Sequence, residues 1–420
     1  MLIIDDQKFK EYVEKAPDCK TTIHFWDLYP GHYTKLKKEF QKQFFKESIK
    51  KGGNYYTNLS KKLGISRRTI AECSKCKTNP QISIILRIAK FLNFPLEEIE
   101  KNILEVSNLK PKFPFNLHSP EGAEIRAAFL SDGHLPARPI KPPTYMAFEI
   151  ELHKRLVRLC KRVFGDFDAQ TKFSGKTHVT LFPAVIGTAL ELAGVPRKDK
   201  RLVKTFVPKD ILLGQRRIQA SYLRRVFDDE GDVCFDKHGK RAVRITRSTD
   251  ITNQNLNTAS LKSEKWTFIK KLNVPISHLL YGEQLLLCKL GIDARVYSEG
   301  LYKSLNNRIT AKWRIQIGQQ SSLRKFAELI NFNLKEKQEK LSKMLKSYKR
   351  EKFPNGEGEK FSIRVLKSIY SRKGYIMFGD LAKELIKTGR SYDLAGWYLK
   401  ILIEKKVIQK IKRGKYVFIN

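Results

Sequence analysis

Two acidic residues occupy matching places in the chain and could act together. Asp132 precedes Gly133 and Glu230 precedes Gly231, and each acid closes a stretch with the apolar spacing of a helix. Carboxylates at the C-terminal end of a helix face the negative pole of its dipole, which is unfavourable. This unfavourable placement occurs twice in the same way, which marks the two acids as a candidate site. A shared Mg²⁺ or Mn²⁺ ion would offset the repulsion, and such an ion can promote phosphodiester hydrolysis by polarising the phosphate and activating water.

The elements around the two acids repeat. The acids lie 98 positions apart, which suggests an internal duplication. In each half, the apolar spacing predicts a helix, two strands, a second helix, two further strands and a last helix. Two copies of this αββαββα order predict an α+β fold with mainly antiparallel sheets.

Alternation in two stretches predicts polar strand faces without acids. In residues 308–317 the row consists of Arg308, Thr310, Lys312, Arg314 and Gln316. In residues 172–181 it consists of Lys172, Ser174, Lys176, His178 and Thr180. With Arg244 from the strand at 241–247, such faces could lie along a major groove and present donors to base edges. A solvated sheet face is the alternative.

The middle part of the chain resembles the two-motif LAGLIDADG homing endonucleases. Their nine-residue motif matches Ile125–Gly133 (IRAAFLSDG) and Leu223–Gly231 (LRRVFDDEG), and the resemblance covers roughly residues 119–349. It implies two motif helices packed at the centre of a pseudo-twofold saddle, with Asp132 and Glu230 holding divalent metal beneath the DNA. It also implies that a basic residue of the catalytic pocket corresponds to Lys335 and, in the first half, to Lys200.

One position departs from the family pattern. The third motif residue is normally small so that the helices can touch; it is Ala127 in the first copy and Arg225 in the second. An arginine in that contact costs several kcal/mol unless it turns out to phosphate or finds a partner. The neighbouring acids Asp228, Asp229 and Asp232 are expected to cap helices or face solvent.

Both ends of the chain carry patterns of nucleic-acid-binding modules. Residues 1–107 include two short helices joined at Gly64, and the second presents Arg67, Arg68 and Thr69 after a capping serine, which resembles a Cro/repressor-type helix-turn-helix. An ordinary helical bundle is the alternative. Residues 361–420 read as three helices and a hairpin and resemble a winged helix, a class that sometimes contacts proteins instead of DNA. Its candidate DNA contacts are Arg390, Lys412 and Arg413.

Proline content and charge divide the chain into predicted domains. Linkers are expected at 108–120 and 350–360, on either side of a two-repeat domain at 121–349 with repeats at about 121–214 and 215–349. The formal net charge of +39 over 420 residues favours a polyanionic partner, and double-stranded DNA is the first candidate. The sequence shows no signal peptide and no membrane-spanning run, so we expect a cytoplasmic protein.

Three functions fit these patterns. The first is a site-specific, homing-type DNA endonuclease, favoured because both acids are present. The second is a transcription regulator that keeps the scaffold without cleavage, and the third is an RNA-binding maturase. An intein is disfavoured because position 1 is Met1 and not a splice-type Cys or Ser. The chain also ends in Phe418, Ile419 and Asn420 and not in a His-Asn pair. Symmetry within one chain predicts a monomer.

Overall fold

The computed structural model describes residues 6–198, 204–236, 240–252, 276–303, 309–348 and 357–419. The chain forms two compact units of mixed helix and strand. The first comprises Met1–Glu230, Thr246–Leu290 and Tyr297–Arg314, and the second comprises Gly231–Ile245, Gly291–Val296 and Ile315–Asn420. This division passes through the second predicted repeat and not through the predicted linkers.

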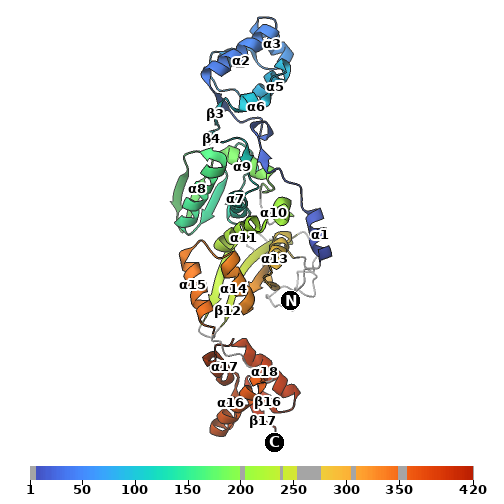
Figure 1. Cartoon of the computed structure of the whole chain (residues 1–420), viewed down its shortest axis with the longest axis vertical. Coiled ribbons are helices and arrows are strands. Elements are labelled where there is room, and N and C mark those ends of the chain that lie inside the picture. The colour runs from blue at the N-terminus through green and yellow to red at the C-terminus, as the bar shows by residue number, and fades with distance from the viewer. Residues whose placement is uncertain are drawn as a thin grey trace. The chain divides into compact units, whose positions relative to one another are not determined.

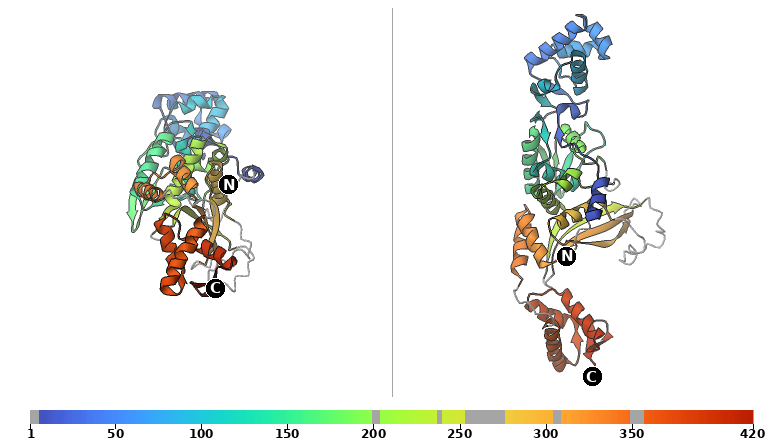
Figure 2. Two further views of the ribbon diagram at one scale, coloured as in Figure 1. Left: turned by 60° about the horizontal axis from the view of Figure 1, so that its bottom comes forward. Right: turned by 45° about the vertical axis from the view of Figure 1, so that its right-hand side comes forward.

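The first unit begins with a small helical module. After α1 (Asp6–Lys15), the module contains α2 (Lys38–Lys51), α3 (Tyr56–Leu63), α4 (Arg67–Ser74), α5 (Ile82–Leu92) and α6 (Leu96–Glu100), which Figure 2 shows in blue to cyan. Helix α3 ends at Gly64, whose φ of 61° is a left-handed conformation that glycine tolerates. Ser66 then caps α4 by accepting a 3.1 Å hydrogen bond from the Thr69 backbone. The two short helices and their tight turn agree with the sequence pattern.

The proline-rich stretch 108–120 is packed, which corrects its prediction as a linker. Strand β4 (Lys110–Pro111) pairs with β8 (Gly165–Asp166), and β5 (Phe115–Asn116) pairs with β1 (Thr22–Ile23). Phe115 and Leu117 are fully buried. The prolines interrupt helical and strand periodicity, but the apolar side chains between them still enter the core. Upstream, η1 (Phe25–Asp27) precedes the paired strands β2 (Thr34–Leu36) and β3 (Ile103–Val106).

The first repeat follows the predicted order of elements. It contains α7 (Pro120–Leu130), β6 (Gly133–His134), β7 (Thr144–Ala147), α8 (Ile150–Phe164), β9 (Gln170–Ser174), β10 (Thr177–Leu181) and α9 (Ala184–Leu192), followed by α10 (Lys209–Leu213). Its sheet has the order β6-β7-β10-β9. Ser119 caps α7 and Pro120 occupies its first turn, which are standard signals for a helix start.

The second repeat has the same sheet order. It contains α11 (Arg216–Glu230), β11 (Gly231–Phe235), β12 (Arg241–Asp250), α13 (His278–Lys289), β13 (Arg295–Lys303), β14 (Ile309–Ile317) and α14 (Gln320–Leu329), followed by α15 (Lys335–Lys346). Its strands lie in the order β11-β12-β14-β13, so in both sheets the fourth strand of the repeat lies between the second and the third.

The C-terminal part of the second unit has its own core. It consists of α16 (Glu357–Lys373), β15 (Ile376–Met377), α17 (Phe378–Lys387), α18 (Asp393–Glu404), β16 (Ile408–Lys412) and β17 (Lys415–Phe418). Its buried residues include Leu366, Leu381, Leu385, Leu399 and Leu402. The predicted linker 350–360 overlaps the start of α16 at Glu357. No helix in the described ranges is long and apolar enough to cross a membrane.

Candidate functional site

The two motif helices, α7 and α11, pack against each other in the first unit (Figure 1). Ala127 and Arg225, the third residues of the two motifs, are both fully buried. At the end of α7, a Cβ atom on Gly133 would lie 2.5 Å from the Phe129 Cα, so only glycine fits this close approach. The packing brings the helix ends that carry Asp132 and Glu230 into one region of this unit.

Arg225 finds partners within the protein. Its Nε donates to Asp229 Oδ2 at 3.1 Å, and its Nη1 donates to the Leu152 carbonyl at 3.4 Å. Its guanidinium lies over the Tyr145 ring, 4.8 Å from the centroid. The unusual arginine therefore does not prevent contact between the helices, because its charge is paired next to the contact.

Asp229 is buried in this ion pair, which corrects its prediction as a cap or solvated acid. Its side chain has no exposed surface, and the Tyr145 hydroxyl donates to its Oδ1 at 2.7 Å. Burial raises the pKa of Asp229 to about 7; nearby Arg225 opposes this shift, and Asp132 adds to it. The backbone carbonyl of Asp132 accepts from the Met146 N–H at 3.3 Å, one residue from Tyr145, so Asp132 lies near the same cluster. Asp228 is also buried, whereas the side chain of Asp232 is half exposed and pairs with Arg244.

Glu230 is held by a buried arginine that the sequence reasoning did not single out. Arg247, in β12, donates from Nη1 to Glu230 Oε1 at 3.1 Å and to the Leu130 carbonyl at 3.5 Å. Its Nη2 donates to Ser131 Oγ at 3.2 Å. One guanidinium thus contacts the last turn of α7 and the terminal acid of α11. A cation here is also favoured by the dipoles of both helices.

Glu283 balances the charge of Arg247. It lies in α13, its side chain is fully buried, and it accepts from Arg247 Nε at 3.1 and 3.2 Å and from Nη2 at 2.6 Å. Burial raises the pKa of Glu283, while Arg247 acts in the opposite direction. Arg247 and Glu283 form a nearly neutral buried pair, so Glu230 keeps most of its negative charge.

The side chains at the helix ends fit a divalent cation by their chemistry. Glu230 uses Oε1 for Arg247, and its Oε2 has no hydrogen-bond partner among the described residues. Three acids, Asp229, Glu230 and Glu283, pair with two guanidiniums, those of Arg225 and Arg247, and Asp132 adds a fourth carboxylate to this region. When all are ionised, two negative charges remain. Within the described ranges, no group of three or more His, Cys, Asp or Glu side chains is arranged as a metal site, so any ion here would rely on two carboxylates, water and phosphate.

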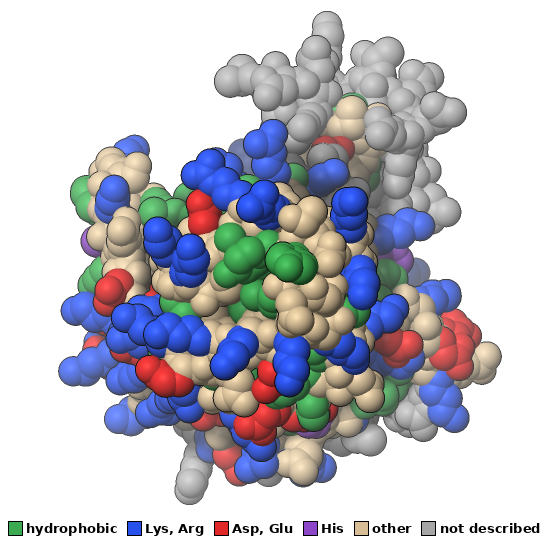
Figure 3. All heavy atoms as spheres, turned by 90° about the horizontal axis from the view of Figure 1, so that it is seen from above, with side chains coloured by type: hydrophobic (Ala, Val, Ile, Leu, Met, Phe, Trp, Pro, Cys, Tyr) green, Lys and Arg blue, Asp and Glu red, His purple; other side chains and the backbone are tan. Residues whose placement is uncertain are grey.

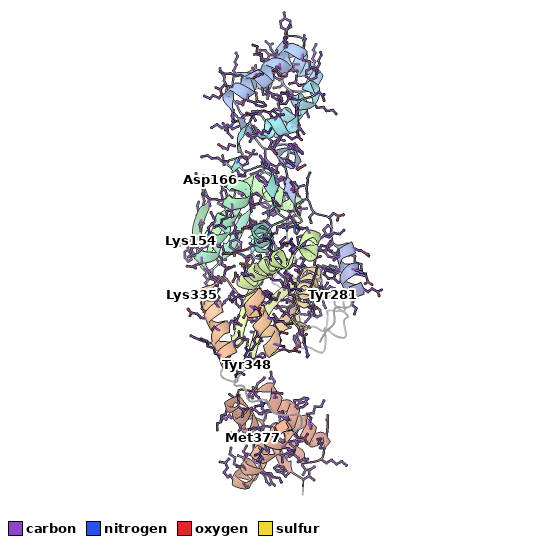
Figure 4. All side chains as sticks on the ribbon, in the orientation of Figure 1. Lys154, Asp166, Tyr281, Lys335, Tyr348 and Met377 are labelled. Atoms are coloured by element: carbon purple, nitrogen blue, oxygen red, sulfur yellow. The ribbon has the colours of Figure 1, made fainter. Side chains whose placement is uncertain are left out.

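The two predicted basic pocket residues have different outcomes. Lys335 is the first residue of α15 in the second unit and is exposed (Figure 4). A lysine at the positive pole of a helix is unfavourable for local stability, as the acids at the opposite poles of α7 and α11 are. Lys200 lies outside the described residues. A catalytic role for either lysine remains a prediction.

The prediction that alternate residues from Lys172 to Thr180 share one face of the first sheet is wrong. Residues 172–181 form a hairpin with a two-residue turn, in which Lys172 pairs with Val179 and Phe173 pairs with His178. Lys172 therefore shares a face with Val179, while His178 lies on the opposite face beside His153 of α8, with ring centroids 5.7 Å apart. Lys176 lies in the turn. A two-residue turn places the residues on either side of it on the same face, so counting alternate residues through it assigns the wrong face.

The predicted row of β14 does alternate, but acids accompany it. Thr310, Lys312, Arg314 and Gln316 are partly exposed, and their neighbours Ile309, Ala311, Ile315 and Ile317 are buried, whereas Trp313 is partly buried. From β13, Glu299 lies 2.8 Å from Arg314 Nη1 and 3.9 Å from Lys312 Nζ. Arg244 donates from Nε to Asp232 at 3.0 Å. These cations are thus partly balanced before any ligand binds. Arg308 lies outside the described residues.

The candidate DNA contacts of the terminal modules lie at the surface to different degrees. Arg67 and Arg68 are exposed, and Arg68 pairs with Glu72, whereas Thr69 belongs to the cap of α4. Viewed from above, basic side chains surround a small apolar patch (Figure 3).

In the C-terminal module, Lys412 and Arg413 are exposed. Arg390 precedes α18 and donates to Thr388 Oγ1 at 2.8 Å.

Comparison with known proteins gives only distant structural matches. No protein-family model and no curated protein matches the chain. Mesophilic variants of the homing endonuclease I-DmoI match at 13% identity and a TM-score of 0.32, over 54% of this chain and 100% of theirs. Full-length DUF199/WhiA from Thermatoga maritima matches at 13% identity and a TM-score of 0.32, over 68% of this chain and 92% of its own. The N-terminal LAGLIDADG domain of DUF199/WhiA matches at 13% identity and a TM-score of 0.28, over 55% and 89%. Similarity at these scores does not determine function, which has to be inferred from the chain's own residues.

Proposed function

We propose that the protein is a site-specific, homing-type DNA endonuclease that hydrolyses phosphodiesters with divalent metal. The main supporting observation is the packing of the two motif helices, with Glu230 paired to Arg247 and Asp229 paired to Arg225 at the end of α11. When all four acids are ionised, the two uncompensated negative charges suit a divalent cation such as Mg²⁺ or Mn²⁺. The formal charge of +39 supplies the attraction for double-stranded DNA.

In this proposal, each group has a separate role. Asp132 and Glu230 would bind the metal, which when present polarises the phosphate and lowers the pKa of a bound water. Arg247 holds Glu230 in place, and Arg225 fixes Asp229 beside Asp132. Lys335 and Lys200 would stabilise charge that develops on the phosphate. The exposed cations of the terminal modules would position the duplex through phosphate contacts.

The test uses supercoiled plasmid carrying the genomic sequence that flanks the gene, with Mg²⁺. The wild-type chain should cut at one site. Asp132→Asn and Glu230→Gln should each lower the rate by more than about 100-fold, since ligands matter more than the outer partners of a metal site. Asp166→Asn, which changes an exposed carboxylate paired with Lys161, is the matched control and should cut normally. Cutting that persists in the Asp132 and Glu230 variants would refute the assignment.

A DNA-binding regulator without cleavage is the second candidate. The Arg247–Glu230 ion pair supports it, because a buried guanidinium already offsets part of the charge that a metal would require. In that case the chain would bind one DNA site tightly, would leave it intact in Mg²⁺ and Mn²⁺, and would bind it equally well after Glu230→Gln. A monomer is expected for either function and can be checked by light scattering.

A further inference from the structure

The buried pair Arg247–Glu283 has a geometry that a purely structural ion pair does not need. Its guanidinium also bonds to Glu230 Oε1, to the Leu130 carbonyl and to Ser131 Oγ. The planar fork of an arginine can serve these separate partners at once, whereas a lysine ammonium cannot. The side chain therefore links the end of α7 to the terminal acid of α11.

Charge balance sets what this link does to the proposed metal site. A lone buried arginine beside Glu230 would cancel the charge of the carboxylate and repel a divalent ion. Glu283, which is fully buried and accepts from both Nε and Nη2, supplies a compensating negative charge from the far side of the guanidinium. Glu230 is thus restrained through one oxygen while its charge stays available.

We propose that Arg247 and Glu283 act together as a positioning pair, which fixes Glu230 by Oε1, leaves Oε2 available to a divalent cation and keeps the site anionic. This inference rests on the proposed function, since it assigns a role around the same two acids. Neither residue is a ligand in this arrangement: Arg247 acts through Glu230, and Glu283 acts through Arg247. The partners of metal ligands typically contribute on the order of 10-fold to 100-fold to metal affinity.

The experiment measures Mn²⁺ affinity of the full chain by titration calorimetry and by the electron paramagnetic resonance of free Mn²⁺, without DNA. Glu283→Gln removes the compensating charge, so Arg247 then opposes the metal, and affinity should fall by about 10-fold or more. The double variant Arg247→Met, Glu283→Gln removes both charges and should recover most of the affinity. Arg247→Lys keeps the charge without the fork and should weaken binding by several-fold.

The matched control is Asp210→Asn. Asp210 forms the same kind of bidentate pair with buried Arg126, at 2.6 and 2.7 Å, but Arg126 lies in the middle of α7, more than one helical turn before Asp132. It should lower the thermal stability while leaving Mn²⁺ affinity within about twofold, because it removes no charge near the acids.

Three results would overturn the inference. The first is wild-type Mn²⁺ affinity in a folded Glu283→Gln variant. If that variant does not fold, unchanged affinity in Arg247→Lys is the second. Neither result touches the proposed nuclease, provided that Asp132→Asn and Glu230→Gln still abolish Mn²⁺ binding. The third is Mn²⁺ affinity that none of these acids affects, and this result removes the proposed function together with the positioning pair.

Discussion

The hydroxyl of Tyr145, in the first repeat, donates a 2.7 Å hydrogen bond to Asp229 at the end of the second motif helix. The same Asp229 accepts from Arg225, whose guanidinium lies over the Tyr145 ring. These three side chains therefore form one buried polar cluster that joins β7 of the first repeat to α11, near Asp132.

Removing the Tyr145 hydroxyl should lower the stability of the folded protein. Tyr145→Phe leaves Asp229 short of a donor in a buried place, and we expect a loss of about 1–3 kcal/mol in the free energy of unfolding, measured by urea titration. Tyr222→Phe is the matched control, because the buried Tyr222 hydroxyl has no hydrogen-bond partner among the described residues. It should be neutral or slightly stabilising, and equal losses in the two variants would contradict this account.

The Arg225–Asp229 pair should behave as a coupled unit. Arg225→Met leaves a buried carboxylate without its counter-charge and is expected to cost about 3–5 kcal/mol. Adding Asp229→Asn removes the stranded charge, so the double variant should be more stable than Arg225→Met alone. A double-mutant cycle on unfolding free energies measures the coupling. Strict additivity would show that the two side chains do not depend on each other.

Acid should destabilise the fold through His32. Burial, with a smaller contribution from Arg197, lowers the pKa of His32 from 6.5 to about 4, and the ring contacts Ser107 and Thr188. The folded state therefore resists protonation that the unfolded chain accepts. The stabilisation is present above pH 6.5 and is lost as the pH falls toward 4, by up to about 3 kcal/mol. His32→Gln should flatten this part of the stability profile; an unchanged profile would exclude His32 as its source.

The affinity for DNA should fall steeply as the salt concentration rises. Each surface cation that contacts a phosphate should contribute to this fall. Replacing Lys412 and Arg413 by alanine should reduce the slope of log affinity against log salt by about 2 if both contact phosphate. Lys405→Ala provides the control, because Lys405 pairs with Glu359 at 2.7 Å and is not a candidate contact. Fluorescence anisotropy at several salt concentrations gives the slopes, and identical slopes would remove the C-terminal module from the DNA interface.

Local signals in the sequence were sufficient for many elements. The stop at Gly64, the cap at Ser66 and the helix that ends before Asp132 all follow from residues within one or two turns of each other. The pairing of Arg225 with Asp229 could also have been found, since the two residues are four apart on one helix. The sequence pattern therefore predicted the two motif helices and where they end, while the role of their acids stays a prediction.

The support of the candidate site was harder to predict because it joins distant segments. Arg247 lies on the same strand face as the buried Val243 and Ile245, and Glu283 lies among the buried leucines of α13. Each is a charged residue on a buried face, and two such residues of opposite sign indicate a buried ion pair. Which distant backbone and acid they would also reach depends on the packing of α7 against α11, which no local pattern specifies.

The turn between β9 and β10 decides which side chains the first sheet turns outward. Its two residues, Gly175 and Lys176, set the outward row that contains Met146, Val179 and Lys172. One added residue that shifted β9 by one position against β10 would exchange Lys172 for Phe173 on the face of Val179, without a substitution in either strand. Loop length alone would then change the chemistry that the sheet offers to a ligand, so insertions and deletions here are a direct route to altered specificity.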